Sequence, residues 1–168
     1  MRINLRFVAR CSIPVFFMLL AGCMTTLPDS ALNLGEAPKP QVNDKKAILY
    51  VYRPHAIPIL WSPSIDIDKT PYASLPNRGF TWFYVEPGEH EIHINWPFLS
   101  GGPSVRFPGK FEAGKTYAYE VTGSMSVGYN QITISGRAKE IALSDAMSLM
   151  QTCCKYAPSN QPETTAGK

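Results

Sequence analysis

Residues 47–52 read Ala-Ile-Leu-Tyr-Val-Tyr, a run that is apolar at odd and even positions alike. Successive side chains of a β-strand point to opposite faces of a sheet, so a strand of this kind has both faces covered. The run 80–85, Phe-Thr-Trp-Phe-Tyr-Val, has the same character and is rich in aromatic residues. These two runs predict central strands of a sheet.

Outward from these runs, the chain alternates between apolar and polar residues with the period of half-buried strands, at 65–68, 91–96, 116–121 and 131–135. Turn-forming residues separate the runs, and Gly88 and Gly114 are expected to take a positive φ. Short strands with turns at this spacing predict a mainly β domain. We expect an antiparallel β-sandwich or partly closed barrel of about seven to eight strands.

One helix is expected near the end of the chain. Ser144 is a suitable N-cap, and Asp145 would lie in the first turn. The residues that follow form a wide apolar face, which comprises Ala146, Met147, Leu149, Met150, Cys153 and Cys154. This C-terminal helix is expected to pack across the sandwich or its open edge.

The first 22 residues have the composition of an export signal. Arg2, Arg6 and Arg10 precede a short apolar run, 11–20, without any acidic residue among them. That run is shorter than the roughly 20 residues that cross a bilayer as a helix. We therefore interpret residues 1–22 as a signal peptide.

Leu20-Ala21-Gly22-Cys23 resembles the lipobox of bacterial lipoproteins. The resemblance implies cleavage before Cys23 and attachment of several acyl chains to it, which together hold a protein on a membrane. Met24 follows where Asp commonly causes inner-membrane retention in this class. The expected location is therefore the outer membrane, facing the periplasm, with the membrane contacted through the lipid anchor.

The boundaries expected from composition are a signal peptide at 1–22, lipidated Cys23 with a flexible tether to residue 44, a β domain at 45–156, and a disordered tail at 157–168. For the tether, the alternative is that part of it packs as an edge strand, since Leu32 and Leu34 are apolar. The net charge of +3 comes from 16 basic and 13 acidic residues. Loss of the three signal-peptide arginines leaves a neutral chain (16 − 3 = 13 basic), so we expect no nucleic-acid partner.

Two turn-rich loops, 55–63 and 96–103, carry large apolar residues. Loops that expose such residues commonly mark a contact site, so Trp61, Trp96, Phe98 and Arg53 form the candidate binding surface. Arg53 precedes Pro54 and would be held extended, free to pair with a carboxylate or a partner. The alternative is that the loops fold inward and plug one end of the sandwich.

The remaining groups of reactive residues favour structural roles. Asp66 and Asp68 are expected on one solvated strand face; His90 would share the face of Ile92 and His93 would face solvent, so neither a shared metal nor a cofactor is expected. Ser126 lacks the glycine that a nucleophile elbow requires two places earlier. Cys153 and Cys154 are expected as two thiols, with a vicinal or intermolecular disulfide as the alternative.

Four short segments follow the lipobox along the chain, and their order matters for the comparison with a known family: 48–54 (Ile-Leu-Tyr-Val-Tyr-Arg-Pro), 64–68 (Ser-Ile-Asp-Ile-Asp), 85–92 (Val-Glu-Pro-Gly-Glu-His-Glu-Ile) and 113–117 (Ala-Gly-Lys-Thr-Tyr). Together they resemble a bacterial lipoprotein family known as domain of unknown function 2846. The resemblance covers about residues 45–122. It implies an envelope β domain and supplies no catalytic residues.

These observations predict a non-enzymatic, lipid-anchored envelope protein that binds or supports another envelope component. An envelope protein is one such partner. One alternative is an envelope hydrolase acting on glycan or peptide, which requires a cleft that joins Asp66 and Asp68 to a histidine. Another is a carrier of a small hydrophobe or lipid, which requires an open apolar cavity between the sheets. The oligomeric state does not follow from the sequence.

Overall fold

The two runs expected to be central strands lie side by side in the first sheet. Strand β1 (Ala47–Arg53) pairs antiparallel with β4 (Gly79–Val85), and Tyr50 stands opposite Trp82. The computed structural model describes residues 27, 30–100 and 103–161. All seven residues of β1 and six of the seven in β4 are buried, so this part of the sheet is covered on both faces.

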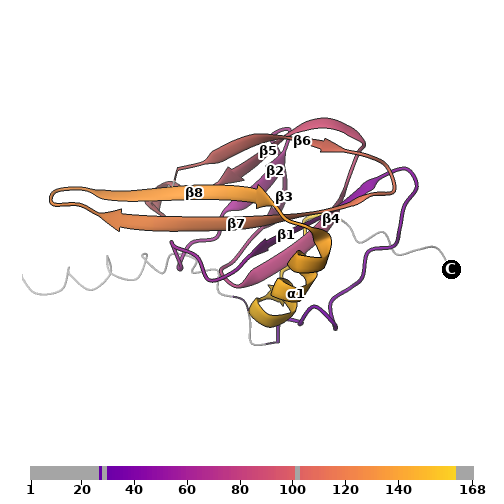
Figure 1. The fold of residues 1–168 in the computed structure, drawn as a ribbon, viewed down its shortest axis with the longest axis horizontal. Coiled ribbons are helices and arrows are strands. Elements are labelled where there is room, and N and C mark those ends of the chain that lie inside the picture. Colours follow the sequence, from indigo (N-terminus) through magenta and orange to yellow (C-terminus); the bar gives the residue numbers. More distant parts are fainter. Residues whose placement is uncertain (1–26, 28–29, 101–102, 162–168) are drawn as a thin grey trace, which may run out of the picture.

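Three further strands complete the first sheet, in the order β8-β7-β1-β4-β9 (Figure 1). They are β7 (Thr116–Val127), β8 (Ile132–Glu140) and β9 (Lys155–Tyr156). Strand β7 runs parallel to β1, and β9 runs parallel to β4, whereas β7 and β8 form a long antiparallel hairpin.

The second sheet is antiparallel throughout, with the order β3-β2-β5-β6. Its strands are β2 (Ser64–Ile67), β3 (Thr70–Ser74), β5 (Gly88–Asn95) and β6 (Val105–Phe111), and a short 3₁₀ helix, η1 (Phe98–Ser100), follows β5. Asp68 and Lys69 join β2 to β3 with φ of 49° and 70°, the two positive values that a tight hairpin turn requires. The positive φ predicted at Gly88 and Gly114 is also present.

The main core lies between the two sheets. Odd-numbered residues of β1 meet the inward residues of the second sheet, and the core members include Leu49, Val51, Ile65, Ile67, Leu75, Phe83, Ile92, Ile94 and Phe111. A second apolar cluster lies on the outer face of the first sheet, with Tyr50, Tyr52, Phe80, Trp82, Ala146, Met150 and Tyr156. The described chain therefore has three layers: the second sheet, the first sheet, and a layer that covers the first sheet from outside (Figure 1).

Helix α1 (Leu143–Cys153) is part of the outer layer and buries Ala146 and Met150. The prediction that the helix packs across the sandwich is confirmed on the outer face of the first sheet. Ser144 as N-cap is wrong: Ala142 holds that position without a side-chain bond, and Ser144 Oγ instead meets Asp145 Oδ1. Asp145 does lie in the first turn.

The predicted mainly β fold with one C-terminal helix is confirmed as a two-sheet sandwich without closure into a barrel. The described residues contain nine strands, against the seven to eight expected, and the last of them, β9, has only two residues. The sheet is not wholly antiparallel, because two long connections return β7 beside β1 and β9 beside β4 in the parallel sense. Among the described residues, no helix has the length and hydropathy needed to cross a membrane.

The segments that flank the strands are packed more than expected. In the segment expected as a tether, residues 32–41, named here the strap, lie against the domain. They do not form the edge strand of the alternative, because their strand pairing within the described chain is limited to one isolated bridge between Asn33 and Lys155. Ala37 is buried, and the Leu32 carbonyl accepts a hydrogen bond from Tyr156 N at 2.6 Å. The described part of the expected tail packs too, since Asn160 N donates to Tyr72 O at 2.7 Å. Main-chain partners therefore fix both segments.

Cys153 and Cys154 form a vicinal disulfide, so the expectation of two thiols is wrong and the alternative holds. A ring between adjacent cysteines fits poorly inside a helix, but this ring lies at the helix end. Cys153 is the last residue of α1, and Cys154 has already left the helix, with φ −134° and ψ 150°.

Three buried tyrosines, Tyr50, Tyr52 and Tyr119, lie on strands of the first sheet. Tyr52 donates to Glu120 Oε2 and Tyr119 donates to Glu140 Oε2, each at 3.1 Å. Burial, followed by the neighbouring carboxylate, raises the pKa of Tyr52 and of Tyr119 well above the usual value. Burial and the neighbouring Tyr84 and Tyr156 raise the pKa of Tyr50 to about 12.

These shifts predict a two-step alkaline titration. Part of the tyrosinate absorbance of the folded protein should appear only well above pH 10, because Tyr50, Tyr52 and Tyr119 keep their protons there. A tyrosine whose pKa is higher in the folded chain stabilises the fold at every pH below its pKa in the unfolded chain, which is about 10. This stabilisation is lost as the pH rises from about 10 through the pKa of the folded chain. The same chain in guanidinium should titrate in one step. A single step near pH 10 with circular dichroism unchanged would contradict the burial of these hydroxyls.

Candidate functional site

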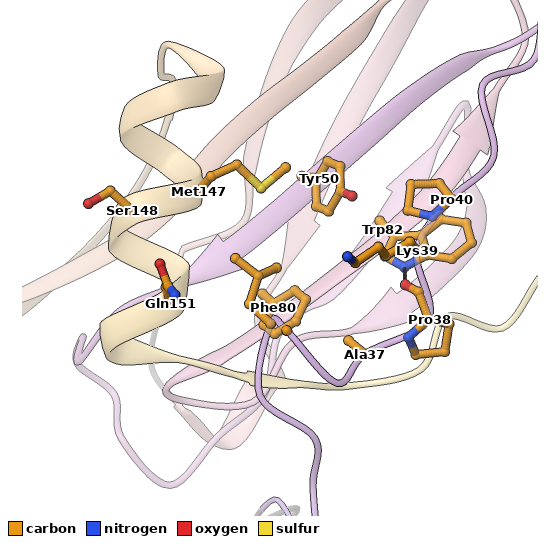
Figure 2. A pocket seen from close by; sticks show the side chains of 12 residues that line it. Ala37, Pro38, Lys39, Pro40, Tyr50, Phe80, Trp82, Met147, Ser148 and Gln151 are labelled. Carbon is orange, nitrogen blue, oxygen red and sulfur yellow. Dashed lines mark hydrogen bonds between the residues drawn. The ribbon is translucent and has the colours of Figure 1, made fainter.

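A groove of about 620 Å³ lies on the outer face of the first sheet, between the strap and α1 (Figure 2). Its lining is mainly apolar and comprises Leu34, Gly35, Ala37, Pro38, Lys39, Pro40, Tyr50, Phe80, Trp82, Met147, Ser148 and Gln151. Sites for small molecules are typically apolar clefts of roughly 300–1,000 Å³. The size and lining of the groove fit that description.

The floor of the groove comes from β1 and β4. Tyr50 and Trp82 are directly opposed in the pairing register, so their rings lie side by side on the outer face. Phe80 lies two residues from Trp82 and shares its face, and its ring centroid is 5.6 Å from that of Tyr156. An aromatic floor follows directly from the apolar even-numbered positions of these two strands.

The strap forms one wall and is held by aromatic side chains of β4. Trp82 Nε1 donates to the Pro38 carbonyl at 2.7 Å. The Tyr84 hydroxyl accepts from Gln41 N at 3.1 Å and donates to Gln41 O at 2.9 Å. Proline at 38 and 40 suits this position because the segment needs few N–H donors and a fixed φ.

Helix α1 forms the opposite wall. Ala146 and Met150 face the sheet and are fully buried, and Met147, Ser148 and Gln151 line the groove. Figure 2 shows the Met147 side chain reaching from the helix toward Tyr50. Leu149, on the same helix, is exposed and does not line the groove. The unbranched Met147 side chain can adapt to ligands of different shape.

The electrostatics of the groove are simple. Lys39 is the one charged residue in its described lining and is exposed. The Tyr50 hydroxyl is neutral at physiological pH, with a pKa that burial raises to about 12, so it can act as a hydrogen-bond donor or acceptor. The arrangement can hold an apolar chain against aromatic rings, with a negative group near Lys39.

Arg53, expected on the binding surface, is instead fully buried at the end of β1. Its guanidinium donates to the carbonyls of Trp61 at 2.7 Å, Ala56 at 2.9 Å and Leu75 at 3.4 Å, and to that of Pro58. Within the described chain, its hydrogen bonds go to main-chain carbonyls rather than to a carboxylate. Burial lowers its pKa to about 10, which still leaves it charged at neutral pH.

Trp96 is also buried, and the Arg53 Cζ lies 4.7 Å from the centre of its ring. Neither residue therefore belongs to the proposed binding surface. The buried charge of Arg53 is compensated by main-chain carbonyls and by the aromatic face of Trp96. Trp61 is half-buried, and its carbonyl belongs to the same cluster. The loop 55–63 thus plugs the end of the sandwich, as the alternative proposed.

Phe98 is the member of the expected surface that the structure leaves open, with 96% of its area exposed. It lies in η1, beyond the end of β5. Ile59 and Leu60 of the other loop are also exposed. Of the two loop tryptophans, Trp96 is buried and Trp61 is half-buried, while Ile59, Leu60 and Phe98 at the loop tips stay in contact with solvent.

The candidate carboxylates and histidines divide into separate pairs. Asp68 Oδ2 lies 2.6 Å from His90 Nδ1, and the other ring nitrogen lies 2.9 Å from the Glu86 carbonyl. Bonds from Glu91 N and His90 lower the pKa of the exposed Asp68. Because both nitrogens of His90 face protein oxygens, neither is free to take a substrate proton.

His93, expected to face solvent, is buried, and its Nε2 lies 2.5 Å from Glu91 Oε2. Asp66, its cross-strand partner, accepts a hydrogen bond from Asn95 at 2.5 Å. Neighbouring side chains on the outer face of the second sheet cover the ring, an effect that alternation alone does not reveal. Within the described residues, no three His, Cys, Asp or Glu side chains are grouped to hold a metal ion.

Residues 43–136 match the family model of a protein of unknown function, DUF2846. The match spans more than half of the chain. The chain belongs to the DUF2846 family. The comparison with curated proteins found no match, and the comparison with solved structures found none either.

The DUF2846 region supplies only part of the groove. It contains the floor residues Tyr50, Phe80 and Trp82, while the strap residues 34–40 and helix α1 lie outside the matched range. The groove was not predicted from the sequence, because its described lining contains neither a group of reactive polar residues nor a turn-rich loop with large apolar residues. The available signal was the apolar character of 47–52 and 80–85 on both faces, which requires a covering layer outside the sheet.

The Arg53 cluster predicts a large loss of stability on conservative substitution. Arg53→Lys retains the charge but lacks the planar fork that reaches several carbonyls and stacks on Trp96, so the free energy of unfolding should fall by about 3 kcal/mol. Urea unfolding measures this change. The matched control, Arg137→Lys on exposed β8, should change it by no more than about 0.5 kcal/mol. Equal, small effects of the two substitutions would contradict the role given to Arg53.

Proposed function

We propose that this DUF2846 protein is a non-enzymatic, lipid-anchored binding module of the bacterial cell envelope, attached to the outer membrane and facing the periplasm. The component that it binds is an amphiphile with one apolar chain and an acidic head group. The groove between the strap, the first sheet and α1 carries this proposal, because its size and aromatic floor suit such a chain.

The lining favours an apolar chain over a polar ligand. Met147 and the edge of Trp82 offer apolar contact surface, with Phe80 fully buried behind them, while Tyr50 and Gln151 offer a few neutral hydrogen-bonding groups. Burial of apolar surface contributes about 25 cal/mol per Å², so a chain that fills the groove would be held mainly by its hydrocarbon. Lys39 at the strap would favour a carboxylate or phosphate head group.

The position of the groove also supports the proposal. Its wall, the strap, belongs to the segment that leads back toward Cys23, the proposed site of acylation. A ligand in the groove would therefore be held close to the anchored end of the chain. The carrier alternative required a cavity between the sheets; the groove instead lies outside them, and the space between the sheets holds the main core.

A hydrolase is less well supported by the same geometry. It required a cleft that joins Asp66 and Asp68 to a histidine, but Asp66 bonds to Asn95 and Asp68 bonds to His90 in separate places. The described lining of the groove contains no histidine, aspartate or glutamate. This observation favours binding without chemistry at the groove.

Binding can be measured with a long-chain fatty acid brominated on its chain, because bromine quenches the fluorescence of a nearby tryptophan. We expect saturable quenching that is lost in Trp82→Phe. Met147→Trp fills the groove and should weaken binding about tenfold, the equivalent of ~1.4 kcal/mol. Leu149→Trp, on the exposed side of the same helix, should bind like the parent. Unchanged affinity in Met147→Trp would exclude the groove.

The head-group preference has its own pair of variants. Lys39→Glu should weaken binding of the fatty acid about three- to tenfold, whereas Lys45→Glu, outside the groove, should not. An uncharged long-chain alcohol should be insensitive to both. Equal effects of the two substitutions would show that Lys39 does not contact the head group.

Anchoring is tested by labelling cells with a palmitate analogue. The parent chain should take up the label and fractionate with the outer membrane, and Cys23→Ala should do neither, because the thiol that receives the lipid is absent. Cys23→Ser is a second control with a similar volume. Label retained by Cys23→Ala would refute the anchor.

A further inference from the structure

Charged residues are unevenly distributed between the two ends of the sandwich. At one end, ion pairs join Lys46 to Glu86 and Lys115 to Glu112, each at 2.7 Å. At the other end, three segments carry no Asp, Glu, Lys or Arg: residues 54–63, 96–100 and 123–136. These three segments are named here the uncharged end.

The uncharged end gathers most of the exposed apolar side chains. Six of the ten large exposed hydrophobic residues in the described chain belong to it, namely Ile59, Leu60, Phe98, Met125, Val127 and Tyr129. Phe98 and Tyr129 are almost wholly exposed. Solvent-exposed aromatic and aliphatic residues grouped in this way indicate a contact surface.

The β7–β8 hairpin projects past the sandwich at this end (Figure 1). Gly123 and Gly136 face each other at the base of the projection. A Cβ at Gly123 would lie 2.0 Å from the Ile57 carbonyl, and one at Gly136 would lie 3.0 Å from Trp96 Nε1. The glycines let the hairpin pass close to both loops, so the projecting part, residues 124–135, is named here the arm.

The arm is amphipathic. Met125 and Val127 continue the odd-numbered face of β7 that carries the core residues Tyr119 and Val121. Even-numbered Ser124 and Ser126 lie on the opposite face, where Ser124 Oγ meets Ser135 Oγ at 2.7 Å. The apolar core face thus extends beyond the second sheet, and the described chain leaves it uncovered.

The chain that leads to Cys23 leaves the domain at the same end. Leu32 and Asn33 are bound to Tyr156 and Lys155, and β9 pairs with Gly79 and Phe80, the first residues of β4. The nine residues from Cys23 to Leu32 can span at most about 30 Å. An anchor on Cys23 would therefore hold this end, rather than the ion-paired end, toward the bilayer.

We propose that the uncharged end is a membrane-docking surface that rests on the lipid bilayer, with the apolar face of the arm and Phe98 in the head-group region. This inference rests on the anchor in the proposed function. From Ser124 to Gly128 the arm spans roughly 15 Å, more than the roughly 5–8 Å of one head-group layer. Exposed Arg78 and Arg137 border the surface, where they suit anionic head groups.

The depth is limited by the backbone. The outer edges of a two-stranded hairpin carry unpaired N–H and C=O groups, which are costly in hydrocarbon. The arm therefore lies in the interface and does not cross the membrane. A bilayer is favoured over a second copy of the chain or a partner protein because the anchor on Cys23 would bring lipid to this end.

The test uses the lipidated protein in vesicles of phosphatidylethanolamine and phosphatidylglycerol that contain dibrominated phosphatidylcholine. Tyr129→Trp places a reporter at the tip of the arm, and Lys110→Trp places one at the ion-paired end. We expect the emission added by Tyr129→Trp to be shifted to shorter wavelength and largely quenched. The emission added by Lys110→Trp should keep its intensity.

A charge in the arm provides the matched variant. In Val127→Glu/Tyr129→Trp the quenching should be lost, whereas Ser126→Glu/Tyr129→Trp, on the polar face, should retain most of it. Circular dichroism checks that each variant folds. Equal quenching at residues 129 and 110, or none at either in protein that sediments with the vesicles, would overturn the docking surface while the anchor stands.

Two other outcomes also count against it. A shift to shorter wavelength without quenching would assign the arm to a protein neighbour, with a second copy identified if the shift depends on protein concentration in detergent. Failure of the purified protein to sediment with vesicles would refute the anchor itself, and the inference with it.

Discussion

The burial of β1 on both faces is the constraint on which the rest of the structure depends. Seven consecutive buried residues require a layer on each side of the first sheet. The second sheet provides one layer, and its contacts form the main core. The strap and α1 provide the other, and the groove lies between them, beside the largely buried side chains of Tyr50, Phe80 and Trp82. The candidate site is thus a consequence of how a doubly apolar sheet is covered.

The same strand ends in a second constraint. Arg53 brings a charge to a fully buried position, and its Nη1 and Nη2 donate to carbonyls of the loop 55–63 and of Leu75. Trp96 adds an aromatic face from the opposite sheet. One side chain therefore ties together both sheets and a loop at the uncharged end. Its charge is turned inward, so the outer surface of that end consists of uncharged loop tips and the arm.

Six of the strands were predictable because alternation and turn residues report burial directly, as at 92–96 and at Gly114. The strands β3, β6 and β9 were not identified from the sequence, because β3 and β6 are largely exposed and β9 has only two residues. The pairing of β1 with β7 was not predictable, because a parallel neighbour arrives through a long connection that leaves no local signal. Loop tryptophans could not be assigned to surface or core from composition, and Trp96 and Arg53 proved to be buried. The groove was missed for a related reason: its walls, the strap and α1, lie far apart in the chain and meet only over the sheet.

The central claim is that the groove outside the first sheet is the ligand site. A crystal structure of the protein with a fatty acid brominated near the middle of its chain tests this most directly, since the anomalous signal of bromine locates the chain without assumptions. The account predicts a peak between Trp82 and Met147, beneath the strap. A peak between the two sheets, or peaks confined to the arm and Phe98, would contradict it.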